Sequence, residues 1–393
     1  MATSWGEIGN KLILQAKARG EPIIGQFELT SRCNLRCKMC YVCESPNNMS
    51  VVQKELPAGK WIKLAEQARD AGMFYLLLTG GEVLIRKDFR EIYENISMMG
   101  LSITIYSNAT LVTPEFAKWL GRIPPAKFSV TLYGASPETY ERVCGNGKGF
   151  EQALKGIDFL LAEGINVDIK TTIVRGNEYD LEKIGELASK REIAFGMVNY
   201  ISPRREGCYT DPIGQRLTPD DSLELGKRAY NYFKRRREEI NSKKDIYDDN
   251  CITPDNTKPD IDKISSNKSK EEVPESLHDK VVDFDYVQKT KNAFQCSAGN
   301  SSFWVTYDGR MLPCGLLNEP VVYPFDNGFL QAWEDLKKLC REVPVCKECE
   351  KCSLKDVCGP CPAKLKAETG CFNKPAPYLC ELAKRRKTLK MDA

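Results

Sequence analysis

The sequence predicts an α/β fold, in which a partial barrel of six βα units is followed by a cysteine-rich C-terminal extension. Short apolar runs alternate with amphipathic segments between about residues 23 and 200, as strands alternate with helices in a parallel sheet. The chain has 17 cysteines, and ten of them fall between Cys296 and Cys380. Four others crowd one short stretch after the first apolar run, so a barrel and a separate cysteine-dense module are expected.

Each βα unit is recognisable from its own residues. The six predicted strands are Ile24–Leu29, Phe74–Leu78, Ser102–Tyr106, Lys127–Leu132, Asn166–Val174 and Phe195–Tyr200. The helical segments between them are Ala58–Ala71, Phe89–Met99, Pro114–Leu120, Gly149–Glu163 and Leu181–Lys190. Prolines begin helices and glycines close them at Pro57, Pro114, Gly72, Gly100 and Gly164. Right-handed crossovers curl such units into a TIM-like partial barrel, whose reactive groups gather at the carboxyl ends of the strands.

Composition divides the chain into four predicted segments. These are an N-terminal segment at residues 1–22, the barrel at 23–227, a charged bridging helix and linker at 228–292, and the cysteine-dense module at 293–393. The third segment is rich in Lys, Asp, Asn, Ser and Pro, so it buries little and favours a solvated helix followed by a mobile linker. A docking surface for a charged peptide is the alternative interpretation.

Charge and residue usage exclude several classes of protein. The formal net charge is only +3, so the chain lacks the excess of basic residues that is typical of nucleic-acid-binding proteins. The single histidine, His278, excludes a Ser-His-Asp triad and a histidine-rich zinc site. Neither a secretory signal nor a membrane span is recognisable, and a cytoplasmic location is expected. In that reducing compartment, 17 thiols point to metal or redox chemistry rather than disulfides.

The first predicted strand leads into Cys33, Cys37 and Cys40, spaced C-x3-C-x2-C. Three thiolates at this spacing can converge on one iron–sulfur cube and leave its fourth iron without a protein ligand. An open position distinguishes a reactive centre from a structural one. A structural zinc site is the alternative, with Cys43 as its fourth ligand.

Small and polar residues follow the next three strands. Gly80 and Gly81 let a ligand approach the backbone, and Glu82 adds an acceptor suited to an ammonium group. Asn108 with its neighbour Ser107, and Ser129 on the next strand, suit ribose hydroxyls and a nucleoside. Each group is unspecific alone, and the glycine pair alone would be interpreted as a turn.

Taken together, these residues resemble the radical S-adenosylmethionine (radical SAM) superfamily over about half of the chain. The resemblance implies that Cys33, Cys37 and Cys40 bind a reactive 4Fe–4S cluster, whose unique iron is chelated by the amino and carboxylate groups of S-adenosyl-L-methionine. It also implies cofactor-binding roles for Gly80, Gly81 and Glu82 at the methionyl amine, for Ser107, Asn108 and Ser129 near the ribose, and for Met39 at the adenine. The family usually has an aromatic residue where this chain has Met39.

The chemistry that the resemblance implies is reductive cleavage of the cofactor. Electron transfer from the cluster yields methionine and a 5′-deoxyadenosyl radical, which takes a hydrogen atom from the substrate. The cofactor supplies the difficult chemistry, and the barrel supplies placement and shelter. A reductant protein such as flavodoxin or ferredoxin is the implied electron donor.

The C-terminal cysteines are spaced for metal centres. Cys296 and Cys314 flank two short predicted strands around an Asp-Gly turn, and a hairpin would bring both thiols together. Paired C-x2-C elements follow, which zinc ribbons and iron–sulfur proteins share. The whole pattern is similar to the SPASM extension of radical SAM proteins. That resemblance implies two auxiliary 4Fe–4S clusters, one on Cys349, Cys352, Cys358 and Cys380, the other on Cys296, Cys314 and Cys361.

Several thiols have no assigned role. The cluster on Cys296, Cys314 and Cys361 has three ligands in register, so either one iron is open or one of three spare cysteines, Cys340, Cys346 and Cys371, completes it. Cys208 follows the sixth strand, where an inert thiol is favoured over a hydrogen-atom donor.

The predicted function is oxygen-sensitive radical chemistry on a ribosomal precursor peptide, forming a cross-link such as a thioether or carbon–carbon bond. This follows from the SPASM resemblance, because members of that group mostly modify peptides. The first strand begins by about Ile24, which leaves no room for an N-terminal leader-binding domain. The alternatives are a sulfatase maturase, a small-molecule dehydrogenase or epimerase, and a non-enzymatic electron-transfer or zinc-binding scaffold. A protein that only transfers electrons does not need the amine-binding turn that Gly80–Glu82 would form.

Overall fold

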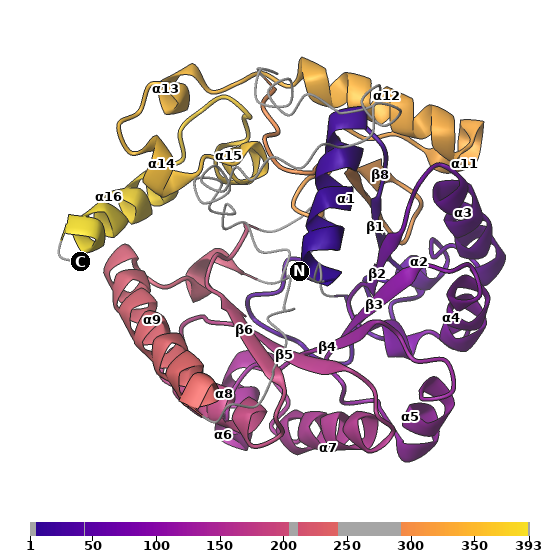
Figure 1. The fold of residues 1–393 in the computed structure, drawn as a ribbon, viewed down its shortest axis with the longest axis horizontal. Helices are drawn as coiled ribbons and strands as arrows, with labels where there is room; N and C mark the ends of the chain where they lie inside the picture. Colours follow the sequence, from indigo (N-terminus) through magenta and orange to yellow (C-terminus); the bar gives the residue numbers. More distant parts are fainter. Residues whose placement is uncertain (1–4, 43, 204–210, 243–291, 392–393) are drawn as a thin grey trace, which may run out of the picture.

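The computed structural model describes residues 5–42, 44–203, 211–242 and 292–391, and its centre is one curled sheet (Figure 1). The sheet order is β6-β5-β4-β3-β2-β1-β7-β8, and every neighbouring pair is parallel except the β7–β8 hairpin. The strands are β1 Ile24–Glu28, β2 Tyr75–Thr79, β3 Ser102–Ser107, β4 Lys127–Thr131, β5 Val167–Thr172, β6 Ala194–Val198, β7 Ser302–Val305 and β8 Met311–Leu312. The predicted partial barrel of six βα units is therefore confirmed.

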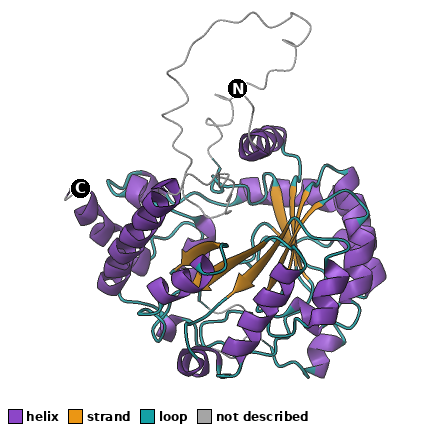
Figure 2. Ribbon diagram, turned by 60° about the horizontal axis from the view of Figure 1, so that its bottom comes forward, coloured by secondary structure: helices purple, strands orange, loops and turns teal. Residues whose placement is uncertain are grey.

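Helices cover the outside of the sheet (Figure 2). Those of the barrel are α1 Trp5–Arg19, α2 Met49–Val52, α3 Ala58–Asp70, α4 Phe89–Ser97, α5 Pro114–Leu120, α6 Pro137–Cys144, α7 Gly149–Ala162 and α8 Leu181–Ser189. The later ones are α9 Pro219–Ser242, α11 Pro324–Asn327, α12 Phe329–Glu342, α13 Lys347–Glu350, α14 Lys355–Cys358, α15 Pro362–Thr369 and α16 Pro377–Met391. All five predicted barrel helices are present, whereas α1, α2 and α6 were not predicted.

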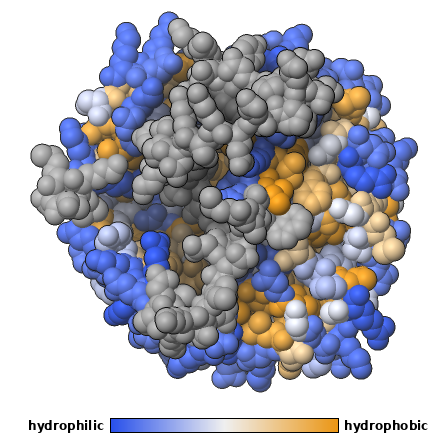
Figure 3. Space-filling model, in the orientation of Figure 1, coloured by the Kyte–Doolittle hydropathy of each residue, from blue (hydrophilic) through white to orange (hydrophobic). Residues whose placement is uncertain are grey.

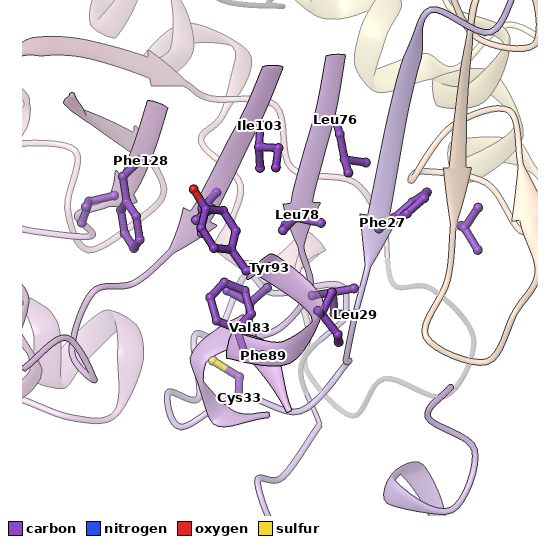
Figure 4. Close-up of a cluster of buried hydrophobic side chains, with 14 of the residues drawn as sticks. Phe27, Leu29, Cys33, Leu76, Leu78, Val83, Phe89, Tyr93, Ile103 and Phe128 are labelled. Atoms are coloured by element: carbon purple, nitrogen blue, oxygen red, sulfur yellow. The ribbon is translucent and has the colours of Figure 1, made fainter. Parts of the chain in front are cut away.

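The main core lies between the sheet and this helical layer. Apolar residues alternate along each strand, so one face of the sheet is apolar and packs on the helices. Figure 4 shows Phe89 and Tyr93 of α4 in the same buried cluster as side chains of β1 to β4, such as Leu78 and Phe128. The rings of Phe89 and Tyr93 stack with centroids 6.1 Å apart. Residues of the other face point into the barrel, where the polar groups of the strands gather.

The β7–β8 hairpin extends the barrel sheet beyond its first strand. β7 pairs in parallel with β1, with Ile24 opposite Ser302 and Phe27 opposite Val305. Gly309 has a φ of +90° in the tight turn of the hairpin, which confirms the predicted Asp-Gly turn. The sheet thus continues into the predicted C-terminal module, and the proposed boundary at residue 293 remains a prediction.

A buried ion pair joins the C-terminal helices to the barrel. Arg216 lies after the sixth strand, and its Nη1 is 3.0 Å from Oε2 of Glu368 in α15. Both side chains are 8% exposed. The hydroxyl of Tyr200 also donates to Glu368, and the Arg216 guanidinium lies 4.5 Å from the ring centroid of Tyr378 in α16. Breaking such a buried pair leaves an uncompensated charge, so this contact fixes α15 and α16 beside the barrel.

The charged bridging helix is present in part. α9 runs from Pro219 to Ser242, so it begins earlier than the predicted segment at 228–292, and α16 packs against it (Figure 1). Residues 243–291, which include the predicted linker, lie outside the described residues. Much of the face in Figure 3 is hydrophilic, with apolar side chains in separate groups. No helix among the described residues is long and apolar enough to cross a membrane.

Candidate functional site

The loop after β1 carries Cys33, Cys37 and Cys40 at the carboxyl end of the barrel. Backbone hydrogen bonds hold this loop on the end of α6: the Arg36 N–H donates to the Cys144 carbonyl at 2.9 Å, and the Lys38 N–H to the Val143 carbonyl at 2.9 Å. Cys33 and Cys37 are buried, and Cys40 is partly buried. A cysteine loop tied down in this way presents its thiols in a defined arrangement.

The thiols of the loop influence one another. The pKa of Cys37 is raised well above its usual value, first by a hydrogen bond with Cys144, then by burial and by the charges of Cys144, Cys40 and Cys33. Three soft thiolates gathered beside a fourth thiol fit an iron–sulfur cluster, which removes their protons on binding. Cys144 was not predicted here, because its helix was not recognised in the sequence.

Gly80 and Gly81 are required by the close approach of the cysteine loop. A Cβ at Gly80 would lie 2.3 Å from the Thr30 carbonyl oxygen, and one at Gly81 would lie 2.3 Å from that of Arg32. Gly80 also has a φ of +154°. The Gly81 N–H donates to the Thr30 carbonyl at 2.7 Å. The glycines therefore let the β1 loop dock on the end of β2, and their contact with a methionyl amine stays a prediction.

Glu82 is a fully buried carboxylate that links the ends of β2 and β3. Its Oε1 accepts from the Ser107 hydroxyl at 2.9 Å and from the Leu84 N–H at 3.0 Å. Its Oε2 accepts from the Asn108 N–H at 2.8 Å. Burial raises the pKa of Glu82, against the lowering effect of these three donors. Oε2 accepts one of them, so it retains a lone pair for a further donor such as an amine.

Asn108 connects the end of β3 to the cysteine loop. Its Nδ2 lies 3.8 Å from Sγ of Cys33 and 2.9 Å from Oδ1 of Asn34, while its Oδ1 accepts from the Thr110 hydroxyl at 2.6 Å. Its side chain is thereby fully occupied in ordering the loop around Cys33. A ribose contact by Asn108 remains a prediction, and the contact with Cys33 was not foreseen.

Ser129 and Met39 differ in how they fit a nucleoside. The hydroxyl of Ser129, on β4, is buried and has no hydrogen-bond partner within the described part of the chain. A buried hydroxyl without a partner is costly unless a ligand satisfies it, so Ser129 fits a ligand-binding role. Met39 is 5% exposed and belongs to the main hydrophobic core. Its contact with adenine stays a prediction.

The C-terminal cysteines form two groups. Burial raises the pKa of Cys296, and the neighbouring charge of Cys361 adds to the rise. Burial raises the pKa of Cys340 to about 12, with a contribution from Cys296. Cys314 ends the hairpin and packs at the edge of the main core. Cys340 therefore lies near Cys296, and its place in the cluster predicted on Cys296, Cys314 and Cys361 stays a prediction.

The second group surrounds Cys349. Its pKa is raised to about 12, first by burial, then by a hydrogen bond and charge from Cys346 and by the charges of Cys358 and Cys380. Cys358 in turn interacts with Cys380 and Cys352. The four cysteines predicted for this cluster are thus linked through effects on the pKa values of Cys349 and Cys358, to which Cys346 contributes, and their binding of one cluster stays a prediction.

Some thiols remain outside both groups. Cys371 is exposed. Cys43, Cys208 and Cys251 lie outside the described residues, so the zinc alternative that uses Cys43 has no structural test. Across the described ranges, no three Cys, His, Asp or Glu side chains are close enough together to hold a single metal ion.

The barrel sequence matches the model of the radical SAM superfamily over residues 27–190. The chain is 27% identical to the AdoMet-dependent heme synthase of Methanosarcina barkeri over 360 residues, 91% of this chain and 96% of that protein. It is 26% identical to the PqqA peptide cyclase of Rhizobium meliloti over 42% of this chain and 44% of the cyclase.

Two solved structures share the fold over nearly the whole chain. Streptococcus suis SuiB bound to precursor peptide SuiA superposes with a TM-score of 0.64 at 16% identity, covering 95% of this chain and 80% of SuiB. The enzyme anSMEcpe with bound AdoMet superposes with a TM-score of 0.63 at 14% identity, covering 94% of this chain and 97% of anSMEcpe. The barrel, its cysteine loop and the family match identify residues 27–190 as a radical SAM domain, and the chain is an enzyme that uses a 4Fe–4S cluster and S-adenosylmethionine.

Proposed function

We propose that this radical SAM enzyme is of the SPASM type and modifies a ribosomally made precursor peptide by installing a cross-link such as a thioether or carbon–carbon bond. The cluster and S-adenosylmethionine, when bound, supply hydrogen-atom abstraction. Cys33, Cys37 and Cys40 would hold the cluster, and the barrel interior would orient the substrate and exclude water.

The observation that carries this proposal is the sheet that joins the two cysteine-bearing parts of the chain. β7 pairs with β1, so Cys296 and Cys314 flank a hairpin on the strand that leads to Cys33. Cross-linking of two X–H groups releases one hydrogen atom, one proton and one electron. A nearby acceptor for that electron is therefore required, and auxiliary clusters on Cys296, Cys314 and Cys361, and on Cys349, Cys352, Cys358 and Cys380, would supply it.

Relatives support a peptide substrate. SuiB has been solved with precursor peptide SuiA, and its fold covers 95% of this chain. The PqqA peptide cyclase is 26% identical over 42% of this chain. A reductant protein such as flavodoxin or ferredoxin would then deliver the electron for each turnover.

A tetrapyrrole is the second candidate substrate. Three relatives that align over more than nine-tenths of this chain are named AdoMet-dependent heme synthase, and the one from Methanosarcina barkeri is covered over 96% of its length. Because that alignment extends through the cysteine-dense module, it supports an oxidative reaction on a haem precursor as well as it supports one on a peptide.

Mass spectrometry separates the two candidates. The anaerobically reconstituted enzyme is incubated with S-adenosylmethionine, a reductant, and either the peptide products of short reading frames beside the gene or Fe-coproporphyrin III, the product named for another relative. Loss of two hydrogen atoms from a peptide, with release of 5′-deoxyadenosine, is the expected result. Modification of the tetrapyrrole alone would favour the second candidate, and a peptide left unchanged would contradict the first.

A further inference from the structure

The inner face of the barrel carries charged residues on its middle strands. Ile105 of β3 and Ile169 of β5 are fully buried in the core between the sheet and the helices. Side chains alternate along a strand, so the neighbouring residues Tyr106 and Lys170 point to the opposite face, into the barrel. Both are partly buried, which is consistent with a position inside the barrel mouth.

Lys170 contacts Tyr106 across the barrel interior. Its ammonium donates a hydrogen bond to the Tyr106 hydroxyl and lies 4.2 Å from the centroid of the ring. No carboxylate lies within ion-pair distance of Lys170 among the residues that the structure describes. A partly buried ammonium whose protein partner is a neutral phenol keeps two donors and an uncompensated charge, and such a charge is costly without an anionic partner.

Two acidic groups of the same interior lie near other donors, although Oδ1 of Asp168 has no hydrogen-bond partner among the described residues. Asp168 precedes Lys170 by two residues on β5, one layer deeper, and its Oδ2 lies 3.5 Å from the Lys127 ammonium. Glu28 of β1 accepts a hydrogen bond from the Trp304 indole at 2.9 Å. Neither carboxylate forms an ion pair with Lys170 in the part of the chain that the structure describes.

A neighbouring hydroxyl also needs a ligand. Ser129 is opposite Tyr106 in the β3–β4 register and is 1% exposed. Phe128 and Val130 are buried in the core, so Ser129 points into the barrel beside Tyr106. Its hydroxyl has no hydrogen-bond partner within the described ranges. The Lys170 ammonium, which has no carboxylate partner, and the Ser129 hydroxyl, which lies opposite Asp168 in the β4–β5 register, therefore face the same interior.

The donors present select the chemistry of that ligand. The Tyr106 oxygen accepts from Lys170, so its own hydrogen is available to donate to a ligand. An ammonium and a phenol that both donate suit a carboxylate, which accepts through two oxygens. Tyr106 is also two residues before Asn108, whose side chain contacts the cluster ligand Cys33. A carboxylate bound here would be anchored on the strand that leads to the reactive centre.

We propose that Lys170 and Tyr106 form a carboxylate-binding subsite that anchors the substrate inside the barrel. This inference rests on the proposed radical modification of a substrate and narrows the substrate to one that carries an acidic group. A peptide supplies such a group as an Asp or Glu side chain or its C-terminus, and a tetrapyrrole supplies it as an acidic side chain.

Binding without turnover tests the subsite separately from the reaction. The holoenzyme is loaded with S-adenosylmethionine, and no reductant is added. One arm titrates coproporphyrin III and its tetramethyl ester. The other titrates synthetic peptides from reading frames beside the gene and the same peptides with Asp and Glu changed to Asn and Gln. The acid form of one probe should bind more tightly than its neutral form, and that probe identifies the source of the carboxylate.

Variants connect that preference to the two residues. Lys170→Met should weaken binding of the acid form about 10- to 100-fold, because hydrogen bonds to a charged group are lost. Binding of the neutral form should be unchanged. Tyr106→Phe should have a smaller effect in the same direction, and Lys170→Arg should restore much of the affinity. Lys155→Met, at an exposed lysine of α7, is the matched control.

The outcomes are distinguishable. Equal binding of acid and neutral forms by the wild-type enzyme, or an effect of Lys170→Met no larger than that of Lys155→Met, would overturn the subsite even if turnover is observed. A carboxylate-dependent affinity that requires Lys170 would support the subsite even if neither probe is modified, in which case only the proposed reaction fails. Thermal unfolding of each variant confirms that it is folded.

Discussion

The side-chain amide of Asn108 lies 3.8 Å from the sulfur of Cys33 and donates a hydrogen bond to it. The two residues are 75 positions apart in the sequence: Cys33 lies in the loop after β1, and Asn108 follows the end of β3. Asn108 is held in place by Asn34 and Thr110, so its donor is fixed before any cluster binds. Hydrogen bonds to ligand sulfurs stabilise the more negative, reduced state of an iron–sulfur cluster.

Asn108→Ala should therefore make the reduction potential of the reactive cluster more negative. The substitution removes the N–H···S donor while the backbone N–H that binds Glu82 remains. A redox titration followed by paramagnetic resonance measures the potential. Asn95→Ala, at an exposed asparagine of α4, is the control and should leave it unchanged. An Asn108→Ala potential equal to that of the control would show that the contact has no electronic effect.

Combined replacement of Cys33, Cys37 and Cys40 by Ala should abolish release of 5′-deoxyadenosine, because the cluster would lose all of its protein ligands. Three 4Fe–4S clusters contain about twelve iron atoms, so the triple variant should retain about eight. Iron and zinc analysis of the reconstituted protein measures this. About four irons together with zinc in the wild-type enzyme would contradict the auxiliary-cluster assignment and favour structural zinc.

Gly80→Ala and Gly81→Ala should each destabilise the protein, because a Cβ at either position would lie 2.3 Å from a carbonyl oxygen of the β1 loop. Steric conflicts of this kind cost about 1–3 kcal/mol or more in the free energy of unfolding. Gly59→Ala in α3 is the matched control: nothing lies within 4 Å of its added Cβ, and it should stabilise the helix by up to about 1 kcal/mol.

Chemical unfolding of the metal-free variants gives these free energies. Affinity for S-adenosylmethionine, measured on the reconstituted proteins, should fall in the two loop variants as the cysteine loop shifts. A Gly80→Ala protein as stable as Gly59→Ala would show that the loop moves without cost and that the glycine is not required by packing.

Local patterns made most of the barrel predictable. Every predicted strand agrees with the structure to within two residues at each end, as with Ile24–Leu29 against the observed Ile24–Glu28, because one apolar face repeats along each strand. The helix Pro137–Cys144 was missed, although the similarly short helix Pro114–Leu120 was predicted. The pairing of β7 with β1 could not be foreseen, since it joins segments about 280 residues apart.

The candidate site was predictable in its residue types and less so in their roles. The spacing of Cys33, Cys37 and Cys40 by itself indicates that the three thiolates bind one metal centre. The role of Gly80 and Gly81 depends on where the β1 loop docks, and the contacts of Asn108 depend on how β3 ends beside that loop. Such contacts are set by tertiary packing, which no local pattern encodes.

Cys340 should supply the fourth ligand of the auxiliary cluster on Cys296, Cys314 and Cys361. The Cys340 thiol interacts with Cys296. It also packs against the turn that follows Cys296, where a Cβ at Gly299 would lie 2.4 Å from the Cys340 sulfur. Cys346 interacts instead with Cys349, and Cys371 is exposed. The thiolate of a peptide cysteine is the competing ligand.

The test uses enzyme in which Cys33, Cys37 and Cys40 are replaced, so that only auxiliary clusters contribute to the paramagnetic resonance spectrum. Cys340→Ser should change the signal of the cluster on Cys296, because oxygen replaces sulfur on one iron, and Cys346→Ser should leave that signal intact. Cys371→Ser, at the exposed thiol, is the matched control. A spectrum unchanged by Cys340→Ser but altered by adding a cysteine-containing peptide would show that the substrate thiolate, rather than Cys340, binds the fourth iron.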